Sequence, residues 1–232
     1  MDAEQLKAVF EQQASRYDQQ WLRLAPLQSA LFFLAEQCLL QLPEQAHLLC
    51  VGVGTGEELL YLAQRFPLWR FTAVEPAAAM LECCRQKAQA AGVLQRCELV
   101  LGYLQDLPVS ACFDGATAFL VSHFLTERQQ RLAFFQQIAS RLKPGAVLLN
   151  ADLACAEQEV QWQAQLSFWQ QLMTGQPPDA EKSALWMQSY RHDVEVSEPS
   201  ELLSLLQQAG FAEVRPVFQA GLLHAWCASR AE

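Results

Sequence analysis

Apolar runs and stretches with helical spacing alternate through the middle of the chain. Five runs have the length of buried strands and cover residues 47–52, 70–75, 97–101, 113–121 and 146–150. Stretches with apolar residues three and four positions apart follow the first, second and fourth runs and predict helices over 57–65, 76–92 and 127–142. Strands that alternate with helices in this way predict a parallel sheet with helices on both faces.

The pattern changes at both ends of the chain. Residues 4–19 and a stretch after Pro26 are predicted helices, and residues 155–174 are a third. A further helix precedes two short runs, 213–218 and 222–228, whose short link predicts a hairpin. The predicted fold class is therefore α/β: a doubly wound, mostly parallel seven-stranded sheet with a C-terminal antiparallel hairpin, N-terminal helices and a helical cap.

The charge balance limits the choice of partners. The chain carries 25 acidic and 16 basic residues, for a net charge of −9. Nucleic-acid binding depends on clustered lysine and arginine, so a nucleic-acid partner is not expected. The most apolar long stretch, Leu22 to Leu42, contains Arg23, Pro26 and Glu36, which makes it a poor membrane span. A small molecule is the expected partner, and the oligomeric state is left open.

Eight cysteines are spread through the sequence, and most lie inside apolar segments. None forms a C-x-x-C pair and none stands near a histidine at metal-ligand spacing, so no metal site is expected. Free cysteine in such segments behaves as a small apolar side chain. Together with an N-terminus that lacks the cationic start of a signal peptide, this predicts reduced thiols and a cytoplasmic location.

The first predicted strand runs into a glycine-rich turn, Gly52-x-Gly54-x-Gly56, and a helix follows at once. Glycine lets the backbone approach a ligand closely, and the start of a helix offers free N–H groups. Glu75 ends the second strand, about 20 residues further on, where a carboxylate can accept hydrogen bonds from ribose hydroxyls. The dinucleotide fingerprint places its last glycine one residue later, and this argues against a nicotinamide-dependent reductase.

Several short motifs stand in the order of a known family. They are the glycine turn, Val74-Glu75-Pro76 with Met80-Leu81, Gly102 with Asp106-Leu107-Pro108, Phe113-Asp114, Leu142-Lys143-Pro144-Gly145 and Ala209-Gly210-Phe211. With them, the chain resembles the class I S-adenosylmethionine-dependent methyltransferases. The segment with Phe10, Ala14, Tyr17 and Asp18 also resembles the small-molecule branch, in which such a segment closes over the cofactor.

The resemblance implies S-adenosyl-L-methionine as the cofactor and transfer of its methyl group to a small-molecule acceptor. It places Gly52, Gly54 and Gly56 beneath the methionine part, and Glu75 at the ribose hydroxyls. The other residues that it puts around the cofactor are Tyr17 and Pro76, Met80 near the adenine, Tyr103 and Leu104 on the other face of that ring, and Phe119 and Leu120 under the sulfonium end.

On this interpretation the chain is a single methyltransferase domain, residues 1–232, in four parts. Residues 1–45 are N-terminal helices and residues 46–152 are the cofactor-binding core. Residues 153–196 are a helical cap inserted over the sheet, and residues 197–232 are a helix with the terminal hairpin.

Two positions depart from the family pattern and keep other functions open. Cys50 stands where an acidic residue is usual, and Tyr103 where aspartate often binds the adenine amino group. A catalytically degenerate subunit that only binds an adenosyl ligand is one alternative. The layout after the fourth strand is also similar to carboxy-S-adenosylmethionine synthases of tRNA modification, for which Lys182 is the candidate partner of the cofactor carboxylate.

Methyl transfer asks the protein to align a nucleophile with the methyl group and to exclude water. His123 follows the fourth strand, where the ligand crevice of such a sheet opens, and histidine titrates near neutral pH, which suits a general base. The alternative is a histidine that only caps its loop or lines the pocket. The row Trp162, Trp169 and Trp186 is interpreted either as an apolar substrate pocket or as ordinary packing.

Overall fold

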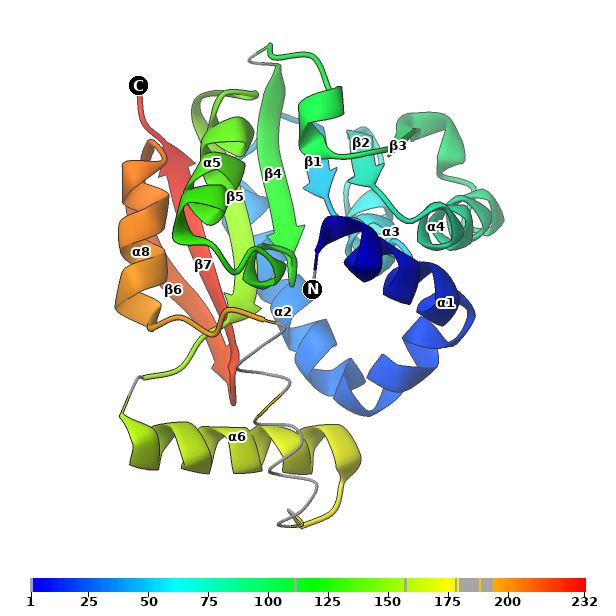
Figure 1. Cartoon of the computed structure of the whole chain (residues 1–232). Coiled ribbons are helices and arrows are strands. Elements are labelled where there is room, and N and C mark those ends of the chain that lie inside the picture. Colours follow the sequence, from blue (N-terminus) through cyan, green and yellow to red (C-terminus); the bar gives the residue numbers. More distant parts are fainter. Residues whose placement is uncertain (1, 111, 157, 178, 180–187, 189–193) are drawn as a thin grey trace.

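The computed structural model of the chain describes residues 2–110, 112–156, 158–177, 179, 188 and 194–232 (Figure 1). The strands are β1 (His47–Val51), β2 (Arg70–Glu75), β3 (Cys97–Leu101), β4 (Phe113–Phe119), β5 (Leu142–Leu153), β6 (Phe211–Ala220) and β7 (Leu223–Arg230). The described α-helices are α1 (Ala3–Trp21), α2 (Ala25–Leu39), α3 (Glu57–Arg65), α4 (Ala78–Ala90), α5 (Arg128–Ala139), α6 (Glu159–Thr174) and α8 (Pro199–Gln208). Short 3-10 helices are η1 (Leu22–Leu24), η2 (Leu94–Arg96), η3 (Leu104–Asp106) and η4 (Ser122–Phe124).

The strands form one sheet in the order β3-β2-β1-β4-β5-β7-β6. The first five positions pair in parallel, and β7 runs antiparallel to both β5 and β6. The fold class predicted from the sequence is therefore confirmed. Because the strand order reverses at β1, between β2 and β4, the carboxyl ends of these strands are where a ligand crevice is expected.

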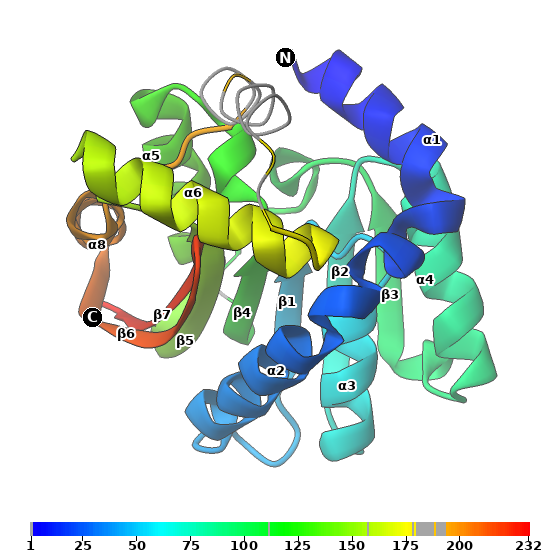
Figure 2. The ribbon, with the colours of Figure 1, turned by 90° about the horizontal axis from the view of Figure 1, so that it is seen from below.

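Helices cover both faces of the sheet (Figure 2). Leucines of α3 and α4, with Leu39 of α2, pack with β1 and β2 in one apolar core. Side chains of α5 and α8, among them Phe135 and Leu202, pack with β4 and β5 in a second core. Each fully buried side chain of this size stabilises the fold by about 1.5–3 kcal/mol, so the two cores hold the sheet rigid beneath the crevice.

Several element boundaries differ from those expected. Strand β4 ends at Phe119 instead of residue 121, because Leu120 adopts a left-handed φ of 58°. Strand β5 is longer than residues 146–150, since β7 pairs along its second half up to Leu153. The expected turn at residues 143–145 is a bulge inside β5, where pairing jumps from Phe113–Leu142 to Gly115–Val147.

Two further boundaries were predicted too early. Helix α4 begins at Ala78, two residues after Pro76, and α6 begins at Glu159, whereas residues 155–174 had been expected to form one helix. The terminal strands are longer than predicted and meet at Gly221.

Helix α6 lies beyond the carboxyl end of β5 (Figure 1). Its Trp162 and Trp169 are buried and pack with Leu24, Phe32 and Leu223, so these two tryptophans belong to ordinary packing. The predicted positions Trp186 and Lys182 lie outside the described residues, and the four-part division of the chain stays a prediction. Among the helices that the structure describes, none has the length and apolar character needed to cross a bilayer.

Candidate functional site

The glycine turn joins β1 to α3 at the carboxyl edge of the sheet. Gly52 and Gly56 have φ values of 64° and 90°, which side chains other than glycine rarely adopt. A Cβ on Gly52 would lie 2.5 Å from Cγ2 of Val121, and one on Gly56 would lie 2.5 Å from Sγ of Cys84. A Cβ on Gly54 would meet no atom within 4 Å. The turn is therefore packed at its two ends and open at its middle residue.

Glu75 at the end of β2 binds this turn directly. Its Oε2 accepts a hydrogen bond of 3.0 Å from the Gly54 N–H, and its Oε1 accepts one of 2.9 Å from the Ala77 N–H. The side chain is buried, and burial raises the pKa of its carboxyl group. The structure thus brings together Gly54 and Glu75, the two sequence-predicted anchors, and each carboxylate oxygen keeps a second lone pair for a ligand.

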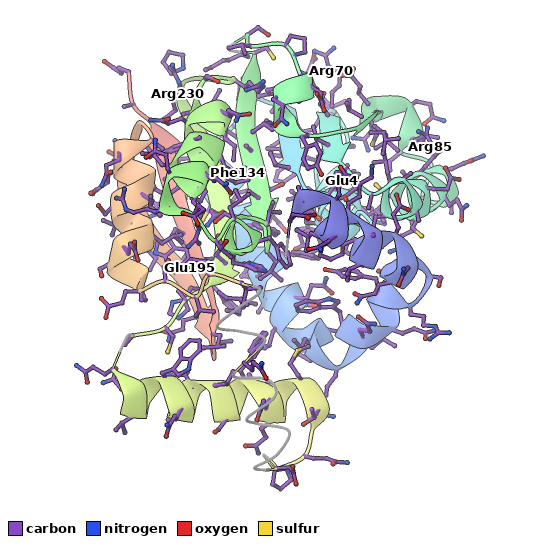
Figure 3. The ribbon with its side chains drawn as sticks, in the orientation of Figure 1. Glu4, Arg70, Arg85, Phe134, Glu195 and Arg230 are labelled. Atoms are coloured by element: carbon purple, nitrogen blue, oxygen red, sulfur yellow. The ribbon has the colours of Figure 1, made fainter. Side chains whose placement is uncertain are left out.

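Helix α1 lies over the adjoining part of the crevice. Phe10, Ala14 and Tyr17 pack against Ala77 and Met80 at the start of α4. Figure 2 shows α1 passing along the sheet edge towards α4, and Figure 3 shows Glu4 at the start of this helix. The adenine position that the resemblance assigns to Met80 is therefore covered by α1 in this arrangement.

Acidic side chains fasten the first half of α1 to α4. The two carboxylate oxygens of Glu11 accept hydrogen bonds of 2.6 Å from the Ala78 N–H and 2.8 Å from the Ala79 N–H. These N–H groups belong to the first turn of α4, where the helix dipole favours a negative charge.

The second half of α1 is fastened through Asp18. Its Oδ1 accepts a hydrogen bond of 2.6 Å from the Thr55 hydroxyl, inside the glycine turn. Its Oδ2 lies 2.5 Å from Nζ of Lys87, which also binds Glu57 at 2.6 Å. We call Glu11 and Asp18 with these partners the α1 clasp.

A cavity of about 90 Å³ opens at the glycine turn. Its walls are Tyr17, Trp21, Leu24, Leu27, Gln28, Leu31, Phe32, Gly52, Val53, Gly54, Thr55, Glu57, Glu58, Phe119, Leu120 and Leu223. A second cavity of about 530 Å³, bounded by α1, α2 and α3, shares Tyr17, Trp21, Gln28, Phe32 and Glu57 with the first. We call them the inner and outer cavities. A cofactor-sized ligand needs about 300 Å³ or more, so the inner cavity is too small to hold one in this arrangement.

The remaining predicted contacts fall into two groups. Tyr17, Phe119 and Leu120 line the inner cavity together with Gly52 and Gly54. Gly56, Glu75, Pro76, Met80, Tyr103 and Leu104 do not line it, although Glu75 bonds to Gly54, which does. Met80 and Leu104 are buried, and Leu104 packs with the core under β4.

Cys50 and Tyr103, the two positions that depart from the family pattern, are both placed by the structure. Cys50 is fully buried, and burial raises the pKa of its thiol well above the usual value. It is therefore a neutral core residue that offers no charge to a ligand. The backbone N–H of Tyr103 donates a hydrogen bond of 2.8 Å to Oδ2 of Asp106, so this carboxylate closes its own loop.

His123 lies in a buried polar network beside the crevice and lines neither cavity. Its Nδ1 is 2.7 Å from Oδ1 of Asp152, which also accepts a 3.0 Å bond from the His123 backbone N–H. The other oxygen of Asp152 bonds with the Ser122 hydroxyl and lies 3.4 Å from a guanidinium nitrogen of Arg131. Burial alone would raise the pKa of Asp152, but the His123 bond and the nearby positive charges lower it below its usual value.

Sequence reasoning missed several residues of this region. Asp152 and Arg131 have no motif that marks them, and they meet only because β5 and α5 pack together. Glu11 is an ordinary acidic position of a polar helix in the sequence, whereas Asp18 belongs to the N-terminal segment that the resemblance singled out, although its bond to Thr55 was not foreseen. Glu58 stands beside Glu57 at a helix start, where acidic residues are common, and nothing in the sequence marks it as buried.

Comparison with known proteins gives three kinds of result. Residues 48–145 match the family model described as a methyltransferase domain. Curated protein sequences give no significant match. Solved structures match widely: an O-methyltransferase family protein from Burkholderia thailandensis superposes with a TM-score of 0.70 at 15% identity, covering 94% of this chain and 60% of that one.

Two further solved structures share the fold. An O-methyltransferase family 2 protein from Planctomyces limnophilus, in complex with apigenin, gives a TM-score of 0.64 at 18% identity and covers 100% of this chain and 62% of that one. The [4+2]-cyclase SpnF gives 0.63 at 15% identity, with coverages of 87% and 80%. The chain spans less than two thirds of the length of the two O-methyltransferases.

The match of residues 48–145 to a methyltransferase domain and the fold shared with solved O-methyltransferases both support the resemblance to class I S-adenosylmethionine-dependent methyltransferases that was drawn from the sequence. The matched residues, 48–145, include the glycine turn, Glu75 and Phe119 of β4. The cofactor of this class is S-adenosyl-L-methionine.

Proposed function

We propose that the chain transfers a methyl group from S-adenosyl-L-methionine to a small-molecule acceptor. The observation that carries the proposal is the bond between Glu75 and Gly54 at the carboxyl edge of the sheet, inside the segment that matches the methyltransferase family. The open middle of the turn and the free lone pairs of Glu75 fit the methionine and ribose parts of the cofactor. The complex of the Planctomyces limnophilus protein with apigenin supports an acceptor of modest size.

The chain itself has little covalent chemistry to perform. When bound, S-adenosyl-L-methionine supplies a methyl group that its sulfonium already activates. Gly52 and Gly54 let the backbone approach the ligand, and Glu75 accepts hydroxyl hydrogen bonds. Phe119 and Leu120 present apolar surface at the end of β4, which excludes water from the reacting atoms.

The general base remains a proposal. Asp152 accepts a hydrogen bond from Nδ1 of His123, which fixes the ring and leaves Nε2 as the atom that could take a proton. In the sequence His123 stands three residues after Leu120, which lines the inner cavity. His123 therefore keeps its proposed role, with Asp152 as the group that positions it.

Calorimetry with three ligands tests the proposed function. S-adenosyl-L-methionine and S-adenosylhomocysteine are expected to bind and NADH is not, because the glycine spacing differs from that of the dinucleotide fingerprint. The absence of binding by both adenosyl ligands would overturn the proposal. Incubation with methyl-labelled cofactor and a panel of phenols, flavones and amines then searches for the labelled product.

The α1 clasp leads to a kinetic prediction. Replacing Glu11 by alanine removes two short hydrogen bonds that hold α1 on α4, each worth about 1 kcal/mol. If α1 has to open for access, the association rate of the cofactor should rise about 30-fold, because the two bonds together contribute about 2 kcal/mol and 1.4 kcal/mol corresponds to a factor of ten. Stopped-flow fluorescence can follow this, since Trp21 stands in the cavity wall.

The matched control is Glu4→Ala, which removes an exposed acidic side chain from the same helix (Figure 3). Its association rate should equal that of the parent protein. A Glu11→Ala rate that is no faster than the Glu4→Ala rate would show that α1 does not limit access.

Two earlier alternatives stay open as predictions. The carboxy-S-adenosylmethionine interpretation rests on Lys182, which lies outside the described residues. A subunit that only binds the adenosyl ligand remains compatible with Cys50 and Tyr103; it predicts binding in calorimetry without labelled product from any acceptor. A cytoplasmic location also remains a proposal.

A further inference from the structure

Glu58 is a buried carboxyl group in the wall of the inner cavity. It stands in the first turn of α3, two residues after Gly56, and only 8% of it is exposed. Apart from Glu57, the side chains that line the same cavity are mostly apolar or aromatic, among them Phe32 and Phe119. A carboxylate in such a place loses most of its hydration and requires compensation.

Within the described part of the chain, few groups offset the cost of burying the Glu58 carboxylate. The carboxyl group meets the N–H groups of Glu58 itself and of Leu59, at the start of its own helix. The nearby cation Lys87 is already held by Asp18 and Glu57. Arg70 and Arg85 lie at the far end of β2 and on the outer side of α4 (Figure 3).

Among the residues that the structure describes, the other titratable groups around Glu58 add no positive charge. They are Glu57 on its own helix, Glu75 on β2, Tyr17 on α1, Cys50 on β1 and Cys84 on α4. Burial raises the pKa of Glu58 to about 8, and the charges of Glu57 and Glu75 act in the same direction. At neutral pH the group is therefore mainly protonated until a positive charge arrives beside it.

We propose that Glu58 is the anionic partner for a cationic group of the ligand that enters the inner cavity. This assignment rests on the proposed function, because S-adenosyl-L-methionine carries a sulfonium and an ammonium group. Either group would convert Glu58 from a protonated acid to a carboxylate, with release of the proton to solvent. A ligand without positive charge would leave the proton in place.

Proton release on binding tests this assignment. Calorimetric titrations at pH 7 in buffers of different ionisation enthalpy measure the number of protons released. Close to one proton is expected for S-adenosyl-L-methionine, given a pKa of about 8. S-adenosylhomocysteine lacks the sulfonium, and 5′-methylthioadenosine lacks both cations. Release with the first ligand alone identifies the sulfonium; release with the first two but not the third identifies the ammonium.

Glu58→Gln keeps the shape of the side chain and removes its ionisation. The variant is expected to bind S-adenosyl-L-methionine without this proton release and about tenfold more weakly at pH 8, because a charge-assisted contact is lost. Glu57→Gln, on the same helix turn, should retain the proton release. Equal release by the parent protein and Glu58→Gln, or none by the parent, would overturn the assignment. A parent protein that binds no adenosyl ligand would instead overturn the proposed function, and this assignment with it.

A second measurement needs no ligand. Because the folded-state pKa lies above its unfolded value, protonated Glu58 contributes stability that is complete below about pH 4.5 and is lost as the pH rises through about 8. The unfolding midpoint of Glu58→Gln relative to the parent should therefore increase between pH 5 and pH 8. A difference that does not change with pH over this range would show that Glu58 is not the buried acid described here.

Discussion

Replacement of Glu75 by alanine is expected to weaken S-adenosyl-L-methionine binding by about 100-fold. The Gly54 and Ala77 N–H groups lose the carboxylate oxygens that hold the glycine turn, and a buried donor without a partner costs about 1–3 kcal/mol. The ribose hydroxyls lose an acceptor at the same time. Calorimetric dissociation constants measure the effect.

Glu75→Gln is the graded control. Its single amide oxygen can accept from one of the two N–H groups, so its affinity should lie between those of the parent and the alanine variant. Urea unfolding establishes whether each variant is folded. A folded Glu75→Ala variant with an unchanged dissociation constant would remove this carboxylate from the cofactor site.

Asp152→Ala is expected to lower the free energy of unfolding by about 3–5 kcal/mol, because it removes one partner of a buried charge pair and leaves the other unpaired. The guanidinium group of Arg131 is 1% exposed, and Asp152 is its nearest carboxylate among the described contacts. Ser122 and His123 lose their acceptor in the same step. Urea titrations measure this loss of unfolding free energy, and the slope of that free energy against urea concentration should be the same in the variant and the parent.

The matched control is Glu82→Ala, which removes a carboxylate that lies 3.4 Å from Arg85 on the surface of α4. Exposed pairs of this kind contribute less than about 1 kcal/mol. Similar losses for the two variants would show that the Asp152 network is not a buried charge pair in solution.

Local signals made much of the fold predictable. Residues 57–65 and 97–101 were predicted with the boundaries that α3 and β3 have, because a glycine turn and short apolar runs mark them. The closeness of Gly54 and Glu75 follows from parallel pairing of β1 with β2, which the strand–helix order already implies. Element boundaries were predicted wrongly where pairing with a segment distant in the sequence determines them, as when β7 pairs with β5 beyond Asn150 and extends it.

The rest of the site depends on contacts between distant segments. Glu11 meets α4, and Asp18 meets Thr55, because α1 folds over the crevice. No pattern distinguishes Glu11 from a solvated acid, and the motif that contains Asp18 does not name its partner. The burial of Glu58 depends on how α1 and α2 cover the start of α3. Such placements follow from tertiary packing, which single-sequence patterns do not report.

The wall that the inner and outer cavities share has a thermodynamic consequence. A molecule bound in the outer cavity would contact Tyr17, Trp21 and Phe32, and these side chains also line the inner cavity. The occupant of one space therefore changes the free energy of filling its neighbour, and linkage requires that this influence be mutual. If the methyl donor and its acceptor occupied these two cavities, the binding of each would change the affinity for the other through the shared aromatic side chains.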